Sequence, residues 1–570
     1  MTDHATTRNI RAATIIWMAS VLLSRVMGFV REIVIARQAG ANAQTDVYFA
    51  AFTIPDFVNY LLAGGALSIT FIPIFAGYLA DGDEEEGWRV FSIVTTFIGV
   101  ALIGVIVPAM VFTEALAPLV ASGFDEAQQA LLVRLTRIIL PAQFFHFEGF
   151  LLSAVQMAKG RHRYPALSPL VYNAGIILGG LLLGPSLGVE GFSWGVLGGA
   201  FAGSFLLQLY GASRVGLLWR PCFDFRHPGL RRYVKLSLPI MLGQSLVAWD
   251  EWLTRQFGSF LTAASISWLN YGRKLAMVPQ AVFGQAASLA SYPHLARLAA
   301  EKRVEEVFQT LSAALRGVLV MALGTQVFLM VLAQEICFLL FRSSRFGDED
   351  VAATAQVLLL FSLGIAAWSM QGIVARGYYA FKDTLSPTLI GTAMTVLSAP
   401  LYYLLSRVLA HQGLALGSTI AITAYAAILY ARFVRKIRRL EPGFRPDPLA
   451  PFLFRLVPAC LLTGGVAWTL HRVTVGWTAP QGTVALWMTR VLPAAESSPL
   501  LVPWLLAFSR VIAVCAVGAP AFVFFCLVFR VDEVRTIVRK IAHKALGRQR
   551  VERWGERGSV LGRLRGRKGQ

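Results

Sequence analysis

The sequence predicts an all-α membrane protein of about fourteen transmembrane helices, arranged as two six-helix lobes around a central cavity and followed by a C-terminal helix pair. Two observations support this fold class. The mean hydropathy of the 570 residues is +0.59, with 56% hydrophobic and 15% charged residues, which is too apolar for a water-soluble chain. A membrane-spanning helix needs about 20 mostly apolar residues, and apolar runs of this length recur along the chain.

Apolar runs and their polar breaks predict the helices in order. The first lobe (1–215) is expected to hold helices at 14–37, 45–79, 90–112, 130–158, 167–183 and 191–210. The second lobe (216–440) is expected to hold helices at 234–257, 266–295, 311–338, 352–379, 385–405 and 413–430. The final pair (441–530) covers 452–470 and 501–528, and residues 531–570 form a basic tail that is expected to rest on anionic headgroups. The first run lacks a small-residue cleavage site, so we interpret it as a retained helix.

The formal charge of +20 comes from Lys and Arg residues that gather on alternate loops. Basic clusters surround Lys159, Arg231, Arg297 and Arg435, whereas the connections between them contain almost no cations. The positive-inside rule then predicts a multi-pass protein of the bacterial inner (plasma) membrane with both termini in the cytoplasm, and not a nucleic-acid-binding protein. The connection 81–86 is acidic although it counts as cytoplasmic, but acidic residues weigh little in this rule.

The two predicted lobes resemble copies of one unit. Pro73 and Pro293 lie in matching segments about 220 positions apart, and Gly191 and Gly413 each open the sixth helix of their lobe. The Lys159-Gly160 turn has its counterpart at Lys382-Asp383. Matches at one offset predict an internal duplication in which both copies keep the same orientation.

Charged residues within the first predicted helix are the main functional signal. Arg25, Arg31 and Glu32 lie in a segment that must cross the membrane, where each charge costs about 2.5 to 3.5 kcal/mol, so we expect them to face a watery cavity or a partner. Glu32 can neutralise one arginine, and Gly28 can supply a bend that lets both arginines point inward. Asp46, at the start of the next helix, is interpreted either as a helix cap or as a partner of these arginines.

The second predicted lobe adds further charges. Glu251 and Arg255 are spaced for an ion pair within one helix, which leaves Asp250 without a local partner. We interpret Asp250, Glu251 and Arg255 as candidate ion-coupling residues, with a structural pair between Asp250 and Arg273 or Lys274 as the alternative.

Cations from both lobes, Arg25, Arg31, Arg273 and Lys274, are expected to line one cleft and to attract an anion such as a diphosphate. No catalytic set accompanies them, so we expect a transporter and not an enzyme. The five cysteines are widely spaced and lack metal-site spacing, so no metal site or cofactor is expected. The sequence leaves coupling to a monovalent cation or to the membrane potential open.

The segment Ser24-Arg25-Val26-Met27-Gly28-Phe29-Val30-Arg31-Glu32, together with Thr45-Asp46 and Ile54-Pro55, resembles the MurJ (MviN) family of lipid II flippases. The resemblance extends from the first helix to the fourteenth. It implies an exporter of the multidrug, oligosaccharidyl-lipid and polysaccharide superfamily, with a lipid-tail groove between the final two helices. It also implies that Arg25, Arg31 and Asp46 handle the lipid pyrophosphate. The implied partners are lipid II, membrane lipids and the cell-wall synthesis machinery.

The sequence departs from the family pattern at several positions. Asn59 replaces an arginine, Gly64 replaces an acidic residue, and Tyr402 replaces an asparagine. The family's acidic-arginine pair in the eighth helix becomes Arg273-Lys274, which keeps positive charge and loses the carboxylate. Alternatives therefore stay open: a flippase for another polyprenyl-linked oligosaccharide such as an O-antigen unit, a cation-coupled drug antiporter, a membrane glycosyltransferase, or a lipid-binding scaffold that does not transport.

Overall fold

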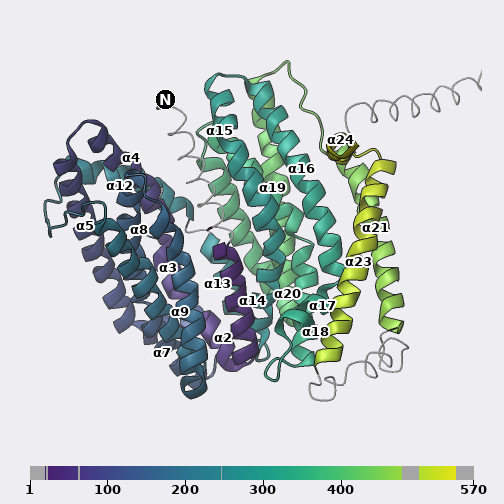
Figure 1. The fold of residues 1–570 in the computed structure, drawn as a ribbon, viewed down its shortest axis with the longest axis horizontal. Helices are drawn as coiled ribbons and strands as arrows, with labels where there is room; N and C mark the ends of the chain where they lie inside the picture. Colours follow the sequence, from purple (N-terminus) through teal and green to yellow (C-terminus); the bar gives the residue numbers. More distant parts are fainter. Residues whose placement is uncertain (1–19, 21–22, 62–63, 245–246, 478–499, 547–570) are drawn as a thin grey trace, which may run out of the picture. The chain divides into compact units, whose positions relative to one another are not determined.

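The computed structural model describes residues 20, 23–61, 64–244, 247–477 and 500–546 (Figure 1). Every regular element in this part of the chain is a helix. Eight of the described helices are long and apolar enough to cross a membrane, and one bent pair brings the count to nine. The all-α membrane fold is confirmed, whereas the number fourteen stays a prediction. The start of the first predicted helix and the tail beyond residue 546 lie outside the described residues.

The chain divides into two compact units that are interleaved along the sequence. The first comprises Met1–Leu275, Cys337–Phe361 and Thr384–Tyr425, and the second comprises Ala276–Ile336, Ser362–Asp383 and Ala426–Gln570. Several helices run from one unit into the other, including α14 (Ser265–Pro279), α17 (Ala333–Phe341) and α20 (Leu385–Leu440). The predicted lobe boundaries at 215/216 and 440/441 remain predictions.

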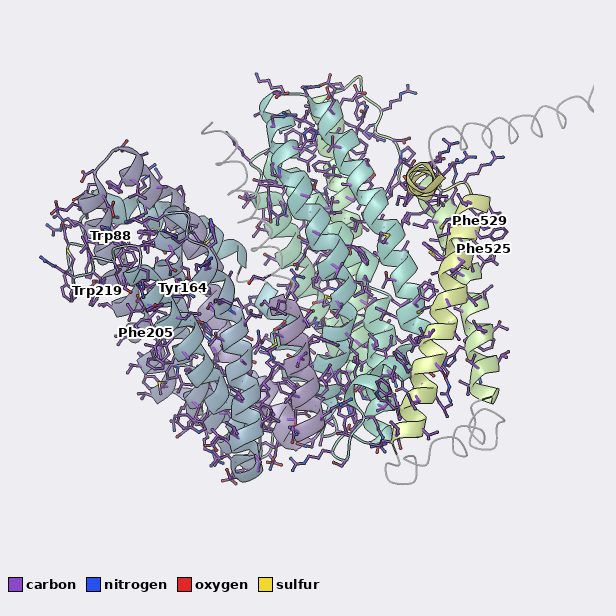
Figure 2. The ribbon with its side chains drawn as sticks, viewed as in Figure 1. Trp88, Tyr164, Phe205, Trp219, Phe525 and Phe529 are labelled. Atoms are coloured by element: carbon purple, nitrogen blue, oxygen red, sulfur yellow. The ribbon has the colours of Figure 1, made fainter. Side chains whose placement is uncertain are left out.

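The first unit begins with a helix over residues 23–39. It continues with α2 (Ala43–Ala50), α3 (Thr53–Leu61), α4 (Gly64–Ala80), α5 (Glu84–Val111), α6 (Thr113–Val120), α7 (Glu126–Ile139), α8 (Ala142–Ala158), α9 (Arg163–Leu187), α10 (Val189–Gly199), a π-helix over Ala200–Leu206, α11 (Leu207–Ser213), α12 (Pro228–Gln244) and α13 (Val247–Gly258), and it includes nearly all of α18 (Asp348–Ser362). Aromatic rings fill a core of this unit: Trp88 (labelled in Figure 2) lies with its ring centroid 5.0 Å from that of Phe75 and 5.6 Å from that of Phe91.

The second unit contains a π-helix over Gln280–Gln285, α15 (Ala286–Ala300), α16 (Val304–Val331), α19 (Ile365–Ala380), α21 (Ala450–Trp477), α23 (Leu501–Val528) and α24 (Asp532–Leu546). The predicted final pair corresponds to α21 and α23, which pack side by side (Figure 1). The helix α24 lies across the end of α23, close to Phe525 and Phe529 (Figure 2).

Some predicted helices are divided in the structure. The predicted helix 45–79 is interrupted after α2 by a turn at Ala51 and Phe52, and it continues as α3 and α4 on either side of residues 62–63, which lie outside the described residues. Pro55 lies in the first turn of α3, where the missing N–H is tolerated. The predicted helix 130–158 begins earlier, at Glu126, because Asp125 and Gln128 form a capping box. It breaks at Pro141, immediately before α8.

Tight turns at the helix ends repeat at the offset that the sequence predicts for the duplication. Gly82 and Gly160 have positive φ angles of 77° and 71°, and Lys302 and Lys382, 220 and 222 positions later, both have φ of 58°. At all four turns the next residue donates its backbone N–H to a carbonyl five positions back, which defines a Schellman motif. The same type of turn therefore occurs at matching positions of the two predicted lobes, which supports the internal duplication.

The acidic connection after α4 meets basic residues from two other loops. The Glu84 carboxylate pairs with Lys159, and Glu86 lies 2.8 Å from the Nε2 atom of His227. Asp83 caps α5 by accepting the backbone N–H of Glu86. The three loops therefore lie at the same end of the first unit, as the predicted topology requires.

Candidate functional site

The Arg31 guanidinium lies in a polar network that joins three helices of the first unit. It contacts the neighbouring Glu32 carboxylate at 2.5 Å and donates to the Asn173 side chain of α9 at 3.1 Å. The second oxygen of Glu32 accepts from Asn270 of α14 at 3.3 Å. Glu32 therefore neutralises Arg31, as the sequence allowed, and also fixes the first helix to α14.

Arg25 and Arg31 differ in exposure. The helix runs without a break from residue 23 to residue 39, and Gly28 lies within it. The Arg25 side chain is exposed, whereas the Arg31 side chain retains 22% of its accessible surface. The two cations are six positions apart, which places them on different sides of a continuous helix.

Asp46 has neither of the two roles that the sequence suggested. The N-cap of α2 is Asn42, whose extended backbone and side-chain oxygen satisfy the N–H of Thr45. Asp46 lies one turn inside the helix, where it cannot cap. Its buried carboxylate accepts from the Ser267 backbone N–H at 2.7 Å and from the Ser267 hydroxyl at 2.6 Å, instead of from an arginine.

One side of α14 carries three donors at successive i, i+3 positions. Ser267 holds Asp46 of α2, Asn270 holds Glu32 of the first helix, and Arg273 holds Asp250 of α13. Residues three apart are neighbours on a helix surface. Each donor therefore binds a carboxylate from a different helix, and α14 connects the candidate site residues of both predicted lobes within the first unit. Sequence reasoning missed Ser267 and Asn270, which lack charge.

The Asp250 carboxylate has ion-pair and hydrogen-bond partners on other helices, although the sequence left it without a local partner. Its carboxylate pairs with Arg273 and accepts from the Tyr402 hydroxyl. The Ser418 hydroxyl lies 3.4 Å from the Asp250 carboxylate and accepts from Arg273 at 3.2 Å. The Arg273 guanidinium also lies 5.3 Å from the centre of the Phe361 ring. The structural alternative weighed for Asp250, a pair with Arg273, is what the structure contains.

Arg255 makes the predicted contact with Glu251 at 3.4 Å and two further contacts. It donates to the Thr53 hydroxyl at 2.9 Å and lies 3.4 Å from the Asp56 carboxylate, both on α3. Lys274 is exposed and forms no ion pair within the described residues. Arg31, Arg255 and Arg273 thus each meet one carboxylate or more, yet a guanidinium has five N–H donors and keeps some for an additional anion.

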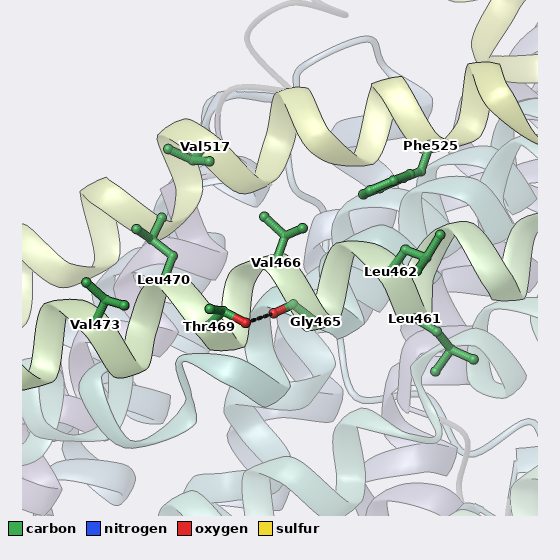
Figure 3. A pocket seen from close by; sticks show the side chains of 9 residues that line it. All are labelled: Leu461, Leu462, Gly465, Val466, Thr469, Leu470, Val473, Val517 and Phe525. Atoms are coloured by element: carbon green, nitrogen blue, oxygen red, sulfur yellow. Dashed lines mark hydrogen bonds between the residues drawn. The ribbon is translucent and has the colours of Figure 1, made fainter.

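The two helices α21 and α23 enclose a separate, apolar groove of about 580 Å³ in the second unit. Figure 3 shows Leu462 and Val466 of α21 extending toward α23, from which Phe525 extends back. The lining is completed by Leu461, Gly465, Thr469, Leu470, Val473 and Val517. Thr469 is the polar exception, and its hydroxyl is used within the helix because it donates to the Gly465 carbonyl at 2.7 Å. The groove suits an aliphatic chain.

A family model described as lipid II flippase MurJ matches residues 35–484. The chain is 29% identical over 469 residues to a probable lipid II flippase MurJ of Haemophilus influenzae, covering 78% of this chain and 90% of the relative. It is 27% identical over 454 residues to the lipid II flippase MurJ of Burkholderia cenocepacia, covering 78% and 87%.

Solved structures show the same fold. A lipid II flippase MurJ in an inward closed conformation aligns with a TM-score of 0.69 and 18% identity, covering 92% of this chain and 100% of that one. An inward-facing multidrug resistance transporter of the MATE family aligns with a TM-score of 0.63 and 13% identity, covering 76% and 99%.

Proposed function

The chain belongs to the MurJ family, because the family model matches more than half of its length, and from this premise we propose that it is a lipid II flippase. It moves a polyprenyl-diphosphate-linked peptidoglycan precursor from the cytoplasmic to the periplasmic leaflet. The family match is the observation that carries the proposal. The protein lies in the bacterial inner membrane with both termini in the cytoplasm, as its loop charges favour.

The diphosphate of the substrate is handled by Arg25, Arg31, Arg273 and Lys274, with Asp46 as a positioning residue. Guanidinium groups bind phosphate oxygens with two parallel hydrogen bonds, and low-dielectric surroundings strengthen this attraction. Glu32 and Asp250 neutralise Arg31 and Arg273 in this structure. Binding a diphosphate then exchanges one anionic partner for another, so the cations remain compensated throughout.

Transport proceeds by alternating access, without covalent chemistry. In this structure, the predicted periplasmic loop around Gly123 is joined to the end of α13: the Gly123 N–H donates to the Ser259 hydroxyl at 3.0 Å, and Gln256 donates to Ser122 at 2.6 Å. These contacts support a state in which the periplasmic end is closed. The periplasmic end can open only if these hydrogen bonds break.

The apolar groove between α21 and α23 accommodates the polyprenyl tail while the headgroup crosses. Its lining offers almost no polar atoms that a hydrocarbon would leave unsatisfied. Coupling to a monovalent cation or to the membrane potential drives the cycle; a cation that binds at Asp250, Glu251 and Arg255 has to displace Arg273 from Asp250 or Arg255 from Glu251. One elementary charge that moves through 100 mV gains about 2.3 kcal/mol. The cell-wall synthesis machinery supplies and consumes the lipid.

Expression in cells depleted of their native flippase tests the proposal. We expect the wild-type chain to restore growth and to translocate lipid II in proteoliposomes, and Arg31→Ala to abolish both while inserting normally. Arg303→Ala is the matched control, because Arg303 pairs with Glu301 and Glu306 on an exposed loop. Retained translocation by Arg31→Ala would contradict the assigned role of this cation, and lipid II binding without flux by the wild type would indicate a scaffold.

A further inference from the structure

A buried carboxylate connects the final helix pair to α17 in the second unit. The Glu335 side chain retains only 5% of its accessible surface. One oxygen lies 2.6 Å from the Nε2 atom of His471 on α21 and 3.7 Å from the Arg510 guanidinium on α23. Its other oxygen is buried and has no hydrogen-bond partner among the described residues. The diphosphate-handling residues belong to the other unit.

Apolar side chains enclose this cluster. Leu332, Ala467 and Val514 are fully buried around it, and Phe328, Val331, Ile336, Leu470 and Val511 pack against them. Within the described residues, the charged or titratable groups that face Glu335 are His471 and Arg510. The helix α16 contributes only apolar side chains. Arg472, the neighbour of His471, is exposed and lies over the Trp468 ring at 5.1 Å.

Protonation of His471 changes the strength of this connection. A neutral imidazole donates one hydrogen bond from Nε2 to Glu335 and can accept a proton from water at Nδ1. The acceptor of this bond is already ionised, so protonation of His471 adds the attraction between an imidazolium and a carboxylate to the existing hydrogen bond. The apolar enclosure strengthens the attraction further. His471 and Arg510 both lie at the same Glu335 oxygen, and the other oxygen has no hydrogen-bond partner among the described residues, so the carboxylate keeps acceptor capacity for two cations.

We propose that His471 is a proton-binding site whose protonation tightens the attachment of α21 to α17 through Glu335. The site lies beside the groove, because Leu470 both lines the groove and packs in the apolar cluster. Proton binding therefore also sets how firmly one groove wall is held. This second consequence rests on the proposed flippase function, whereas the proton site itself does not.

A double-mutant cycle on the purified full-length protein tests the site. Glu335→Gln, His471→Gln and the double variant are compared by thermal unfolding at about pH 5.5 and about pH 8. We expect the coupling between the two substitutions, measured as a shift in Tm, to be larger at the lower pH, because a protonated His471 adds an ion pair with Glu335. Equal coupling at both pH values would overturn the proposal.

Two further measurements keep the outcome decisive. His471→Lys carries a fixed positive charge, so its Tm should lose the part of the wild-type pH dependence that comes from His471. This variant replaces the cycle if His471→Gln fails to fold. A Tm with the same pH dependence as the wild type would refute the proton site. The matched control is the cycle of Glu86 and His227, a similar pair with 27% and 12% exposure, for which we expect a smaller change because water screens it.

Flux in proteoliposomes then tests the link to the groove. The wild type should change its lipid II flux between about pH 5.5 and pH 8, whereas His471→Lys should not. A pH-dependent coupling with no flux from any variant would leave the proton site intact and refute the flippase function. If lipid II flux changes with pH in the same way in the wild type and in His471→Lys, the link between the proton site and the groove is refuted.

Discussion

The ionisable residues of the candidate site are held as pairs and small clusters. Arg31 meets Glu32, Arg273 meets Asp250, and Arg255 meets both Glu251 and Asp56. An uncompensated charge in an apolar medium is far more costly than a paired one. The pairs therefore compensate the charge of these cations in their largely buried positions.

The pair of Asp250 and Arg273 gives a prediction at this scale. Asp250→Asn or Arg273→Gln alone should destabilise the protein by about 3 kcal/mol, because the remaining charge is largely buried and loses the opposite charge of this pair. The double variant should be less destabilised than the sum of the single variants. Thermal unfolding of the purified proteins measures this coupling. Additive effects would contradict it, and the exposed pair of Arg297 and Glu301 should show little coupling.

Sequence reasoning identified the local pairs better than the distant ones. The contact of Glu251 with Arg255 follows from i, i+4 spacing, and Glu32 was expected to neutralise one of the two arginines of its helix, which proves to be Arg31. The bond of Asp46 to Ser267 joins residues 221 positions apart, and neutral donors such as Ser267 carry no signal in a single sequence. Tyr402 stood out only as a departure from a family pattern, although its hydroxyl binds Asp250.

At the scale of elements, helix existence was predictable and helix interruption was not. The apolar runs identify the long helices, because burial in lipid requires them. The breaks within these runs depend on turns such as Ala51-Phe52 and on the short helix α6, which was not predicted. The break between the predicted helices 385–405 and 413–430 is confirmed at Ala410, where φ is 50° and ψ is −130°.

The repeated helix-end turns give the prediction at this scale. The first copy has glycine at the left-handed positions 82 and 160, whereas the second has Lys302 and Lys382. A left-handed conformation costs a residue with a Cβ atom about 1 to 2 kcal/mol. Lys302→Gly and Lys382→Gly should therefore each stabilise the protein by about 1 kcal/mol, measured as a rise in Tm.

The reverse substitution is the control for these turns. A Cβ atom added at Gly82 or Gly160 would meet no atom within 4 Å, so Gly82→Ala should destabilise through the backbone alone, by a similar amount. If Lys302→Gly leaves Tm unchanged while Gly82→Ala lowers it, the lysine turn is held by contacts of its side chain, and the equivalence of the two turns fails.

At the scale of the molecule, the first unit brings together loops that the predicted topology assigns to the periplasm. Trp252 donates to the Leu119 carbonyl at 2.9 Å, and the Gly123 N–H donates to the Ser259 hydroxyl at 3.0 Å. These contacts join segments of both predicted lobes within the first unit. No local pattern in the sequence specifies them, because the joined residues lie 133 to 136 positions apart and use neutral side chains such as those of Trp252 and Ser259.

Gly123 allows the last prediction, which concerns the closed state. A Cβ atom at this position would lie 2.6 Å from the carbonyl group of Ser259 and 2.7 Å from the Phe260 nitrogen. These are backbone atoms that cannot rotate away, so Gly123→Ala must separate the loop from α13. Overpacking costs about 1 to 3 kcal/mol, and 1.4 kcal/mol shifts a two-state equilibrium about tenfold. We expect the closed state to lose population by about this factor.

Cysteine labelling measures the opening. Ala121, which is fully buried in the closed loop, is replaced by cysteine in a variant without the five native cysteines. Its rate of reaction with a membrane-impermeant maleimide should rise about tenfold in Gly123→Ala, and lipid II flux should fall because the cycle no longer closes at this end. Gly104→Ala is the matched control, since a Cβ atom there meets nothing within 4 Å. Labelling of Ala121→Cys at the same rate in both backgrounds would show that this contact does not hold the periplasmic end closed.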